Sequence, residues 1–165
     1  MLKKLIFEWL FKLRIKKNNV QVEGFKEIKT IVIIINLDEN KTCDLEALTH
    51  SFEKLGKSVQ SIGVSPSGRS RKNNEIKVAT KNDFTFFGTP KNPWVQEFFS
   101  NKSDYAILID RSNNYLINHL AIHCKANCYI GYKSIPQNQL LTLQIAPLLE
   151  NEHETFLRYI KLIEN

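Results

Sequence analysis

The chain has 165 residues, the length of one domain that folds around its own core without disulfides or structural metals. Hydrophobic residues make up 42% and charged residues 24%, which excludes an intrinsically disordered chain. The net charge of +6 favours contact with phosphates or anionic lipid without naming a partner. The three cysteines are an odd set, which predicts a reducing, cytoplasmic environment.

Residues 1–17 predict a basic amphipathic helix, followed by a single domain over residues 18–165. On a helical wheel one broad apolar stripe forms, and most basic residues lie off it. The stripe consists of Leu2, Leu5, Ile6, Trp9, Leu10 and Leu13. Phe7 and Phe11 lie on the opposite side of the wheel.

The charges in this first segment exclude a membrane-spanning helix, because the uncharged runs are far shorter than the ~20 residues of a span. No small-residue cleavage site follows, so a signal peptide is not expected either. Two interpretations stay open. The helix packs across the edge of the domain, or residues 1–17 lie on a membrane surface, peripheral to the inner membrane, or dock a protein partner.

The rest of the chain alternates predicted strands with predicted helices. Ile31–Ile35 is a β-branched run typical of a strand buried on both faces at the centre of a parallel sheet. A helix follows, with Thr42 or Asp44 as N-cap and Gly56 at its end. Further strands are expected at Val59–Val64, Ile76–Ala79, Phe84–Phe87, Tyr105–Asp110, Cys128–Tyr132 and Leu140–Ile145, and further helices from Asn92–Pro93, from Ser112 and around Phe156. This order predicts a single three-layer, Rossmann-like α/β domain with a mostly parallel sheet.

The stretch Ser103–Asp110, a helix and the stretch Ala126–Tyr132 resemble the amino-terminal half of bacterial heptosyltransferases. In that family a "yDlvIDl" strand is followed by a helix and an "aa.rIGy" strand. The resemblance covers about a fifth of the chain and implies a single Rossmann-like unit. Those transferases bind the activated sugar mainly in a second domain, so we expect no complete transferase here. The whole layout is also similar to a small uncharacterised domain family of Bacteroidota.

Polar and basic residues follow three predicted strands, at the edge where open parallel sheets bind ligands. They are Asn36 and Asp38 after the first strand, Ser67, Gly68, Arg69 and Arg71 after the second, and Asp110 and Arg111 after the Tyr105 strand. Hydroxyl, backbone and guanidinium donors of residues 67–71 would suit a phosphate group, and a solvated loop is the alternative. For Asp38 and Asp110, capping or turn formation is the alternative to acid–base chemistry.

Motifs for cofactors and for nucleophilic catalysis are missing from the sequence. It contains no G-x-G-x-x-G, no P-loop and no nucleophile elbow, so neither a cofactor nor a catalytic residue is predicted. The zinc-ligand types His119, His123, Cys124 and Cys128 are spread over a helix and a strand, which argues against a closed metal site. Cys43 precedes a helix whose dipole would lower the pKa of its thiol, and an inert thiol is the alternative.

These observations favour a non-catalytic module that binds a protein partner or a small anionic ligand at the carboxyl edge of the sheet. One alternative is a glycosyltransferase-related enzyme or subunit that acts on a sugar phosphate or sugar nucleotide. Another is a basic nucleic-acid-binding protein. The scattered basic residues and the lack of an RNA-binding signature disfavour that last alternative.

Overall fold

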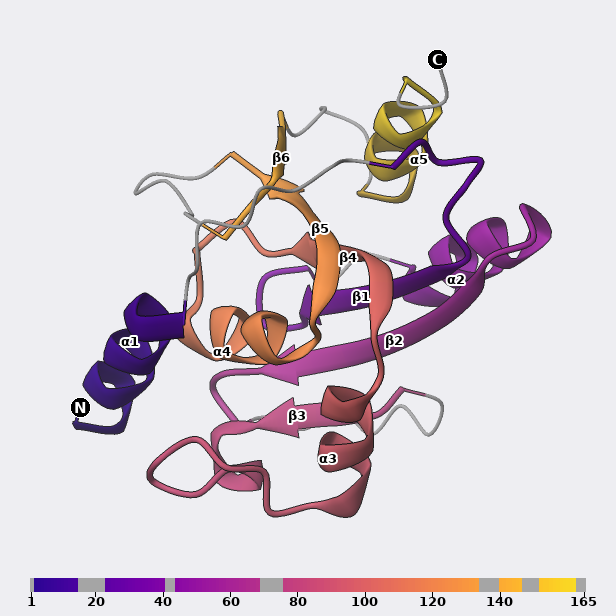
Figure 1. Ribbon diagram of the computed structural model, residues 1–165. Helices are drawn as coiled ribbons and strands as arrows, with labels where there is room; N and C mark the ends of the chain where they lie inside the picture. The colour runs from indigo at the N-terminus through magenta and orange to yellow at the C-terminus, as the bar shows by residue number, and fades with distance from the viewer. Residues whose placement is uncertain are drawn as a thin grey trace.

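The computed structural model describes residues 2–14, 23–40, 44–68, 76–133, 140–146 and 152–162 (Figure 1). Within these residues the strands form one six-stranded sheet in the order β3-β2-β1-β4-β5-β6, and every pairing is parallel. The strands are β1 (Thr30–Asn36), β2 (Ser58–Ser65), β3 (Val78–Thr80), β4 (Ser103–Ile109), β5 (Ala126–Tyr132) and β6 (Leu143–Ile145). This order is that of a Rossmann-like domain and confirms the predicted fold class.

β1 runs through the middle of the sheet, as the run Ile31–Ile35 predicted. β2 pairs with it on one side and β4 on the other, so its backbone groups are used in both directions. Its side chains alternate between the two faces of the sheet. Val32 and Ile34 belong to one hydrophobic core, and Ile31, Ile33 and Ile35 belong to the other. Because both faces are covered, β-branched residues suit every position of this strand.

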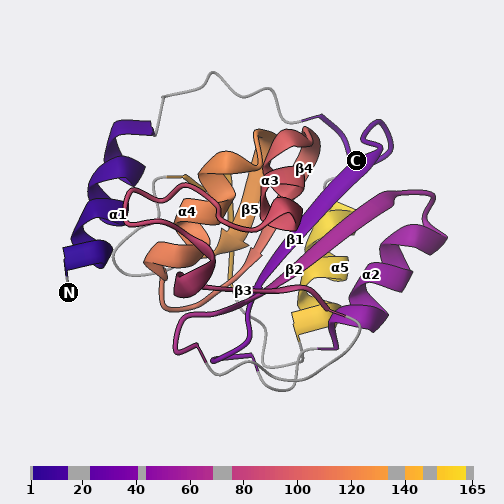
Figure 2. The ribbon, with the colours of Figure 1, turned by 90° about the horizontal axis from the view of Figure 1, so that it is seen from below.

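Helices cover both faces of the sheet, which gives the three predicted layers (Figure 2). On the face of Val32 lie α1 (Leu2–Arg14), α3 (Pro93–Ser100) and α4 (Tyr115–His123). On the opposite face lie α2 (Leu45–Lys54) and α5 (Glu152–Leu162). In the described residues no helix is both long enough and apolar enough to cross a membrane.

α1 packs on the domain through Phe7, which is fully buried. Its ring stacks on His119 of α4, with 4.2 Å between the ring centroids, and meets Phe84 edge-on at 6.2 Å. Leu5 and Trp9, from the predicted apolar stripe, are instead 54% and 60% exposed. Ile6, also from the stripe, packs against the same core as Phe7. The helix therefore docks through Phe7 and one margin of the predicted stripe, and Leu5 and Trp9 lie on its outer side.

Phe84–Phe87 does not form the predicted strand. Phe84 makes an isolated antiparallel bridge with Pro90, and the residues between them close a turn. The Thr85 N–H donates to the Thr89 carbonyl at 2.8 Å, and Gly88 has a φ of +81°. The aromatic run has the composition of a strand, but the glycine at positive φ and the proline that follows end the pairing. We call residues 84–90 the hairpin.

The predicted N-cap of α2 is confirmed, and the predicted N-cap of α4 is wrong. Asp44 caps α2 as predicted, since its side chain accepts from the Ala47 N–H at 2.9 Å. Thr42 and Cys43 lie outside the described residues. Ser112 was predicted to cap α4, which is wrong, because Asn114 takes that place. The Ser112 hydroxyl instead donates a hydrogen bond to the carboxylate of Asp110 at 3.0 Å.

Candidate functional site

The switch point of the sheet lies between β1 and β4, where the order of strand addition reverses. Ligands of open α/β sheets bind in the crevice outside the carboxyl ends of such a pair of strands. Residues 36–40 follow β1 there and residues 110–114 follow β4. The structure thus brings together the predicted site residues Asn36, Asp38 and Asp110.

Asn36 is the centre of this arrangement, and it is almost completely buried. Its amide nitrogen donates to Asp110 Oδ1 at 2.9 Å, and its amide oxygen accepts from the Asp38 N–H at 3.2 Å. One side chain therefore connects the loop after β1 with the loop after β4.

Two further residues, which the sequence did not single out, bridge the same crevice. The Asn40 amide donates to the carbonyls of Asn36 and Ile109, both at 3.0 Å. The carboxylate of Glu39 accepts from the Arg111 N–H at 3.1 Å. The polar groups that would receive a ligand at a Rossmann-like switch point are used here to bond the two loops to each other.

Asp110 organises the loop that leads into α4. Besides the bonds from Asn36 and Ser112, its second oxygen accepts from the Asn114 N–H at 2.5 Å. Burial raises the pKa of this carboxyl, the hydrogen bonds from Asn36, Asn114 and Ser112 oppose the rise, and the charge of Glu39 adds to it. A raised pKa is common among catalytic acids, but both oxygens here are engaged in holding backbone and side chains.

Asp38 uses two donors of the loop after β2 that would suit an anion. It accepts from the Ser65 hydroxyl at 2.9 Å and from the Ser67 N–H at 2.7 Å. Gly68, with a φ of +76°, closes the turn by donating to the Ser65 carbonyl at 3.0 Å. Arg69 and Arg71 lie outside the described residues. The described part of this loop is thus bound to a carboxylate of the protein itself.

One small cavity near this edge is lined by described residues. The guanidinium of Arg111 lies over the ring of Tyr132, 5.4 Å from its centroid. A cavity of about 10 Å³ lies between residues that follow or line β4 and β5, among them Asp110, Asn118 and Tyr132. It has room for one water molecule and none for a sugar or a nucleotide.

The zinc-ligand types do not converge. Cys124 is buried in the core on the α4 side of the sheet, and Cys128 in the core on the α2 side. The Cys124 thiol donates to the Leu120 carbonyl at 3.3 Å, and burial raises the pKa of Cys128 to about 11. His119 donates from Nε2 to the Gly88 carbonyl at 2.8 Å. Each of these groups has a structural role.

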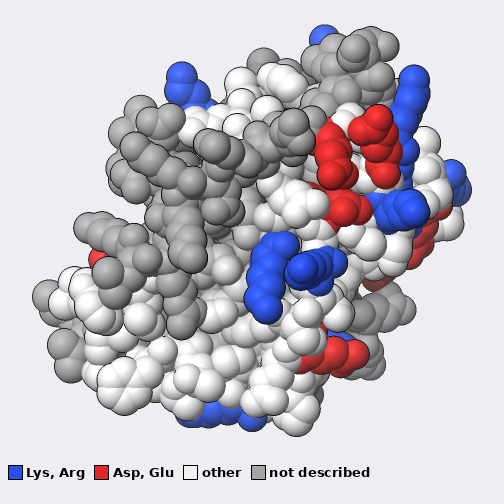
Figure 3. Space-filling model, viewed as in Figure 1, with Lys and Arg blue, Asp and Glu red and all other residues white. Residues whose placement is uncertain are grey.

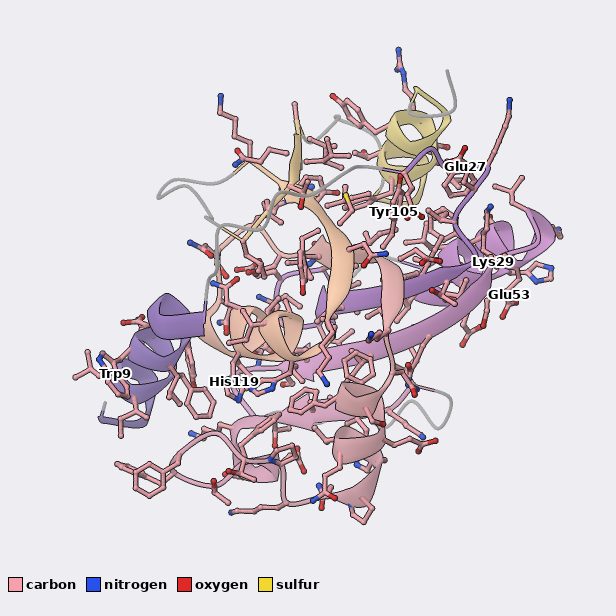
Figure 4. The ribbon with its side chains drawn as sticks, viewed as in Figure 1. Trp9, Glu27, Lys29, Glu53, Tyr105 and His119 are labelled. Carbon is pink, nitrogen blue, oxygen red and sulfur yellow. The ribbon has the colours of Figure 1, made fainter. Side chains whose placement is uncertain are left out.

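A second candidate surface lies on α1 and the hairpin. Of the five large apolar side chains that are exposed in the described residues, four lie there, namely Leu5, Trp9, Phe86 and Phe87. We call these four the α1–hairpin surface. Trp9 points away from the body of the molecule (Figure 4). In Figure 3 the area over the hairpin is mostly white, whereas acidic side chains gather at the upper right. Apolar groups that cluster in this way mark interaction sites.

α1 and the hairpin are held side by side by buried contacts. Figures 1 and 2 both show the hairpin next to α1. Between them lies His119, stacked on Phe7 and hydrogen-bonded to the Gly88 carbonyl. A Cβ on Gly88 would stand 2.5 Å from His119 Cε1 and 3.3 Å from Phe7 Cε1, so the backbone of the hairpin approaches both rings closely.

Comparison with known proteins gives a family and no function. Residues 3–163 match the family of unknown function DUF6913. The chain belongs to this family. It matches no curated protein and no solved structure. Because the match begins at residue 3, the DUF6913 unit includes α1 as well as the sheet.

Part of the sites in this DUF6913 domain is predictable from its sequence. The position of Asn36, Asp38 and Asp110 followed from the rule that parallel strands end at one edge. The bridging roles of Glu39 and Asn40 did not, because a pattern along the chain gives no distances across it. Phe86 and Phe87 lie in a turn and not in the predicted strand. The sequence Gly88-Thr89-Pro90 directly after them predicts a turn at this place.

Proposed function

We propose that this DUF6913 domain is a non-catalytic module that attaches to an anionic membrane surface through α1. The observation that carries the proposal is the orientation of α1. Phe7 anchors the helix to the domain, and Leu5 and Trp9 stay more than half exposed on its outer side. Tryptophan and leucine on the outer side of a surface helix suit the boundary between headgroups and acyl chains.

The distribution of charge supports the same partner. Residues 1–17 contain six of the 23 Lys and Arg and one of the 17 Asp and Glu, a net charge of +5. The remainder holds 17 basic and 16 acidic residues, so it is nearly neutral. Each basic residue near an anionic leaflet contributes about 1 kcal/mol of attraction. The exposed apolar side chains and the positive charge therefore coincide on one segment.

The state of the switch point supports the non-catalytic part of the proposal. Asn36, Asn40 and Asp110 are hydrogen-bonded across the crevice, and the cavity nearby holds no more than a water molecule. A substrate that enters between the loops after β1 and β4 would have to break several of these bonds.

Co-sedimentation with lipid vesicles tests the proposal. Binding to phosphatidylcholine vesicles with about 30% phosphatidylglycerol should be at least tenfold tighter than binding to pure phosphatidylcholine, and it should weaken as salt rises. The variant Leu5→Ser/Trp9→Ser should lose at least tenfold. Leu55→Ser is the matched control, because Leu55 is 45% exposed at the end of α2, away from α1. The absence of binding to anionic vesicles, or equal binding to both compositions, contradicts the proposal.

The nucleic-acid alternative is tested by measuring RNA binding with the same purified protein. Random-sequence RNA that binds with a steep salt dependence, with no binding to vesicles, would favour it.

A second candidate function is an enzyme or subunit related to sugar transfer. It is favoured by the likeness of the β4 and β5 segments to heptosyltransferases and by the polar residues at the carboxyl edge. A sugar nucleotide at 100 times its Kd would raise the free energy of unfolding by about 2.7 kcal/mol. Thermal unfolding with sugar nucleotides and sugar phosphates tests this. A shift that Arg111→Ala reduces would support it, and no shift in the wild type would contradict it.

A further inference from the structure

The hairpin presents two aromatic side chains at the tip of a tight turn. Phe86 is 44% exposed and Phe87 is 74% exposed, and their rings meet edge to face with centroids 5.6 Å apart. The turn below them is held by backbone bonds between Thr85, Gly88 and Thr89 and by the Thr85 hydroxyl, which accepts from the Thr89 N–H at 3.0 Å. A hydrogen-bonded turn therefore keeps both phenylalanines turned to the outside.

The base of the hairpin is buried and fixed. Phe84 is fully buried and meets both Phe7 and His119 edge-on. The Gly88 carbonyl accepts from His119, whose ring stacks on Phe7. The hairpin and α1 thus share one buried support, so the exposed side chains of both are presented together rather than independently.

We infer that the hairpin is a second insertion point, which enters the same anionic bilayer as α1 through Phe86 and Phe87. This inference rests on the proposed function. The continuity of the hairpin with α1 identifies the occupant as lipid, because the adjoining residues 1–17 carry a net charge of +5 that complements anionic headgroups. Aromatic side chains combine a large apolar surface with few rotatable bonds, which suits the interfacial region of a bilayer.

The test is the double variant Phe86→Ser/Phe87→Ser, assayed for binding to the same vesicles. Its binding should fall at least tenfold, and the slope of binding against salt should stay that of the wild type, because no charge is removed. The thermal midpoint should stay close to that of the wild type, since both side chains are exposed. Leu55→Ser again serves as the control.

A fluorescence measurement keeps the inference testable if the serine variant fails to fold. In a Trp9→Phe/Trp94→Phe background, a Phe87→Trp reporter should shift to shorter wavelength on anionic vesicles and be quenched by brominated acyl chains. A Leu55→Trp reporter in the same background should show neither effect.

The outcomes separate the two levels of the proposal. If Leu5→Ser/Trp9→Ser loses binding while Phe86→Ser/Phe87→Ser binds as the wild type and the Phe87→Trp reporter is not quenched, the hairpin inference is wrong and the proposed function stands. If the wild type does not bind anionic vesicles, both are wrong. Vesicle binding that is lost in both double variants, with a quenched reporter at residue 87, supports both.

Discussion

Asp104 and Asp110 stand at the two ends of β4, and their surroundings shift the pKa values of the two carboxyl groups in opposite directions. At Asp110 burial dominates and raises the pKa. At Asp104 burial acts in the same sense, but hydrogen bonds from the Lys29 N–H and from the Thr30 N–H and hydroxyl, with the charge of Lys29, outweigh it and lower the pKa. These bonds measure 2.7, 2.8 and 2.9 Å and tie the start of β4 to the start of β1.

The lowered pKa of Asp104 makes its contribution to stability dependent on pH. A carboxylate with a depressed folded-state pKa stabilises the fold above its unfolded pKa of about 3.9, and loses that contribution as the pH falls through the folded pKa. Asp104→Asn should therefore lower the free energy of unfolding by about 1 to 2 kcal/mol at pH 7. Urea unfolding should show the gap between wild type and variant shrinking below about pH 4. A gap of constant size would mean that the ionised state of Asp104 is irrelevant.

For Asp110 the dependence of stability on pH has the opposite sign. Its raised folded-state pKa means that the protonated form favours the fold, so its contribution is present at acid pH and is lost as the pH rises through that pKa. The two ends of one strand thus respond to pH in opposite senses.

At the scale of elements, the joint between α1, the hairpin and α4 depends on how closely Gly88 approaches His119. Gly88→Ala meets two obstacles, a φ of +81° and a Cβ that would lie 2.5 Å from His119 Cε1. Gly56→Ala is a matched control, because Gly56 has a φ of +77° and open space around its Cβ position. The control should cost about 1 to 2 kcal/mol for the backbone conformation alone, and Gly88→Ala should cost at least about 1 kcal/mol more. Chemical unfolding measures both, and equal losses would show that the His119 contact yields easily.

The sequence predicted elements well where residue type and position agree. The β-branched run Ile31–Ile35 is typical of a strand covered on both faces, and it lies in β1. α1 shows the limit of the same reasoning. A wheel finds an apolar stripe but not the partner that the helix meets. Here Phe7, outside the stripe, contacts His119 and Phe84, and of the stripe Ile6 packs against the same core. The strand prediction at Phe84–Phe87 was wrong because aromatic residues favour strands, whereas the turn sequence Gly88-Thr89-Pro90 that follows leaves only one bridge, between Phe84 and Pro90.

At the scale of the whole molecule, the order of the strands is Rossmann-like, but the loops after β1 and β4 at the carboxyl edge are bonded to each other. Sequence and topology together place Asn36, Asp38 and Asp110 at the expected edge, and to that extent the candidate site was predictable. The hydrogen bonds that close the crevice depend on distances between loops 74 residues apart along the chain, which no local pattern contains. The exposed apolar side chains lie instead on α1 and the hairpin, and the net charge of the chain lies in residues 1–17.

If attachment depends on where the charge lies, variants of equal total charge should behave differently. Lys3→Glu/Lys4→Glu lowers the net charge of residues 1–17 from +5 to +1 and should weaken binding to anionic vesicles at least tenfold. Lys26→Glu/Lys54→Glu makes the same change at exposed positions in the nearly neutral remainder and should bind within about threefold of the wild type at physiological salt, where the Debye length is about 8 Å. Co-sedimentation compares the two. Equal losses would mean that the whole molecule acts as one diffuse positive charge, and the assignment of the membrane contact to α1 would then fail.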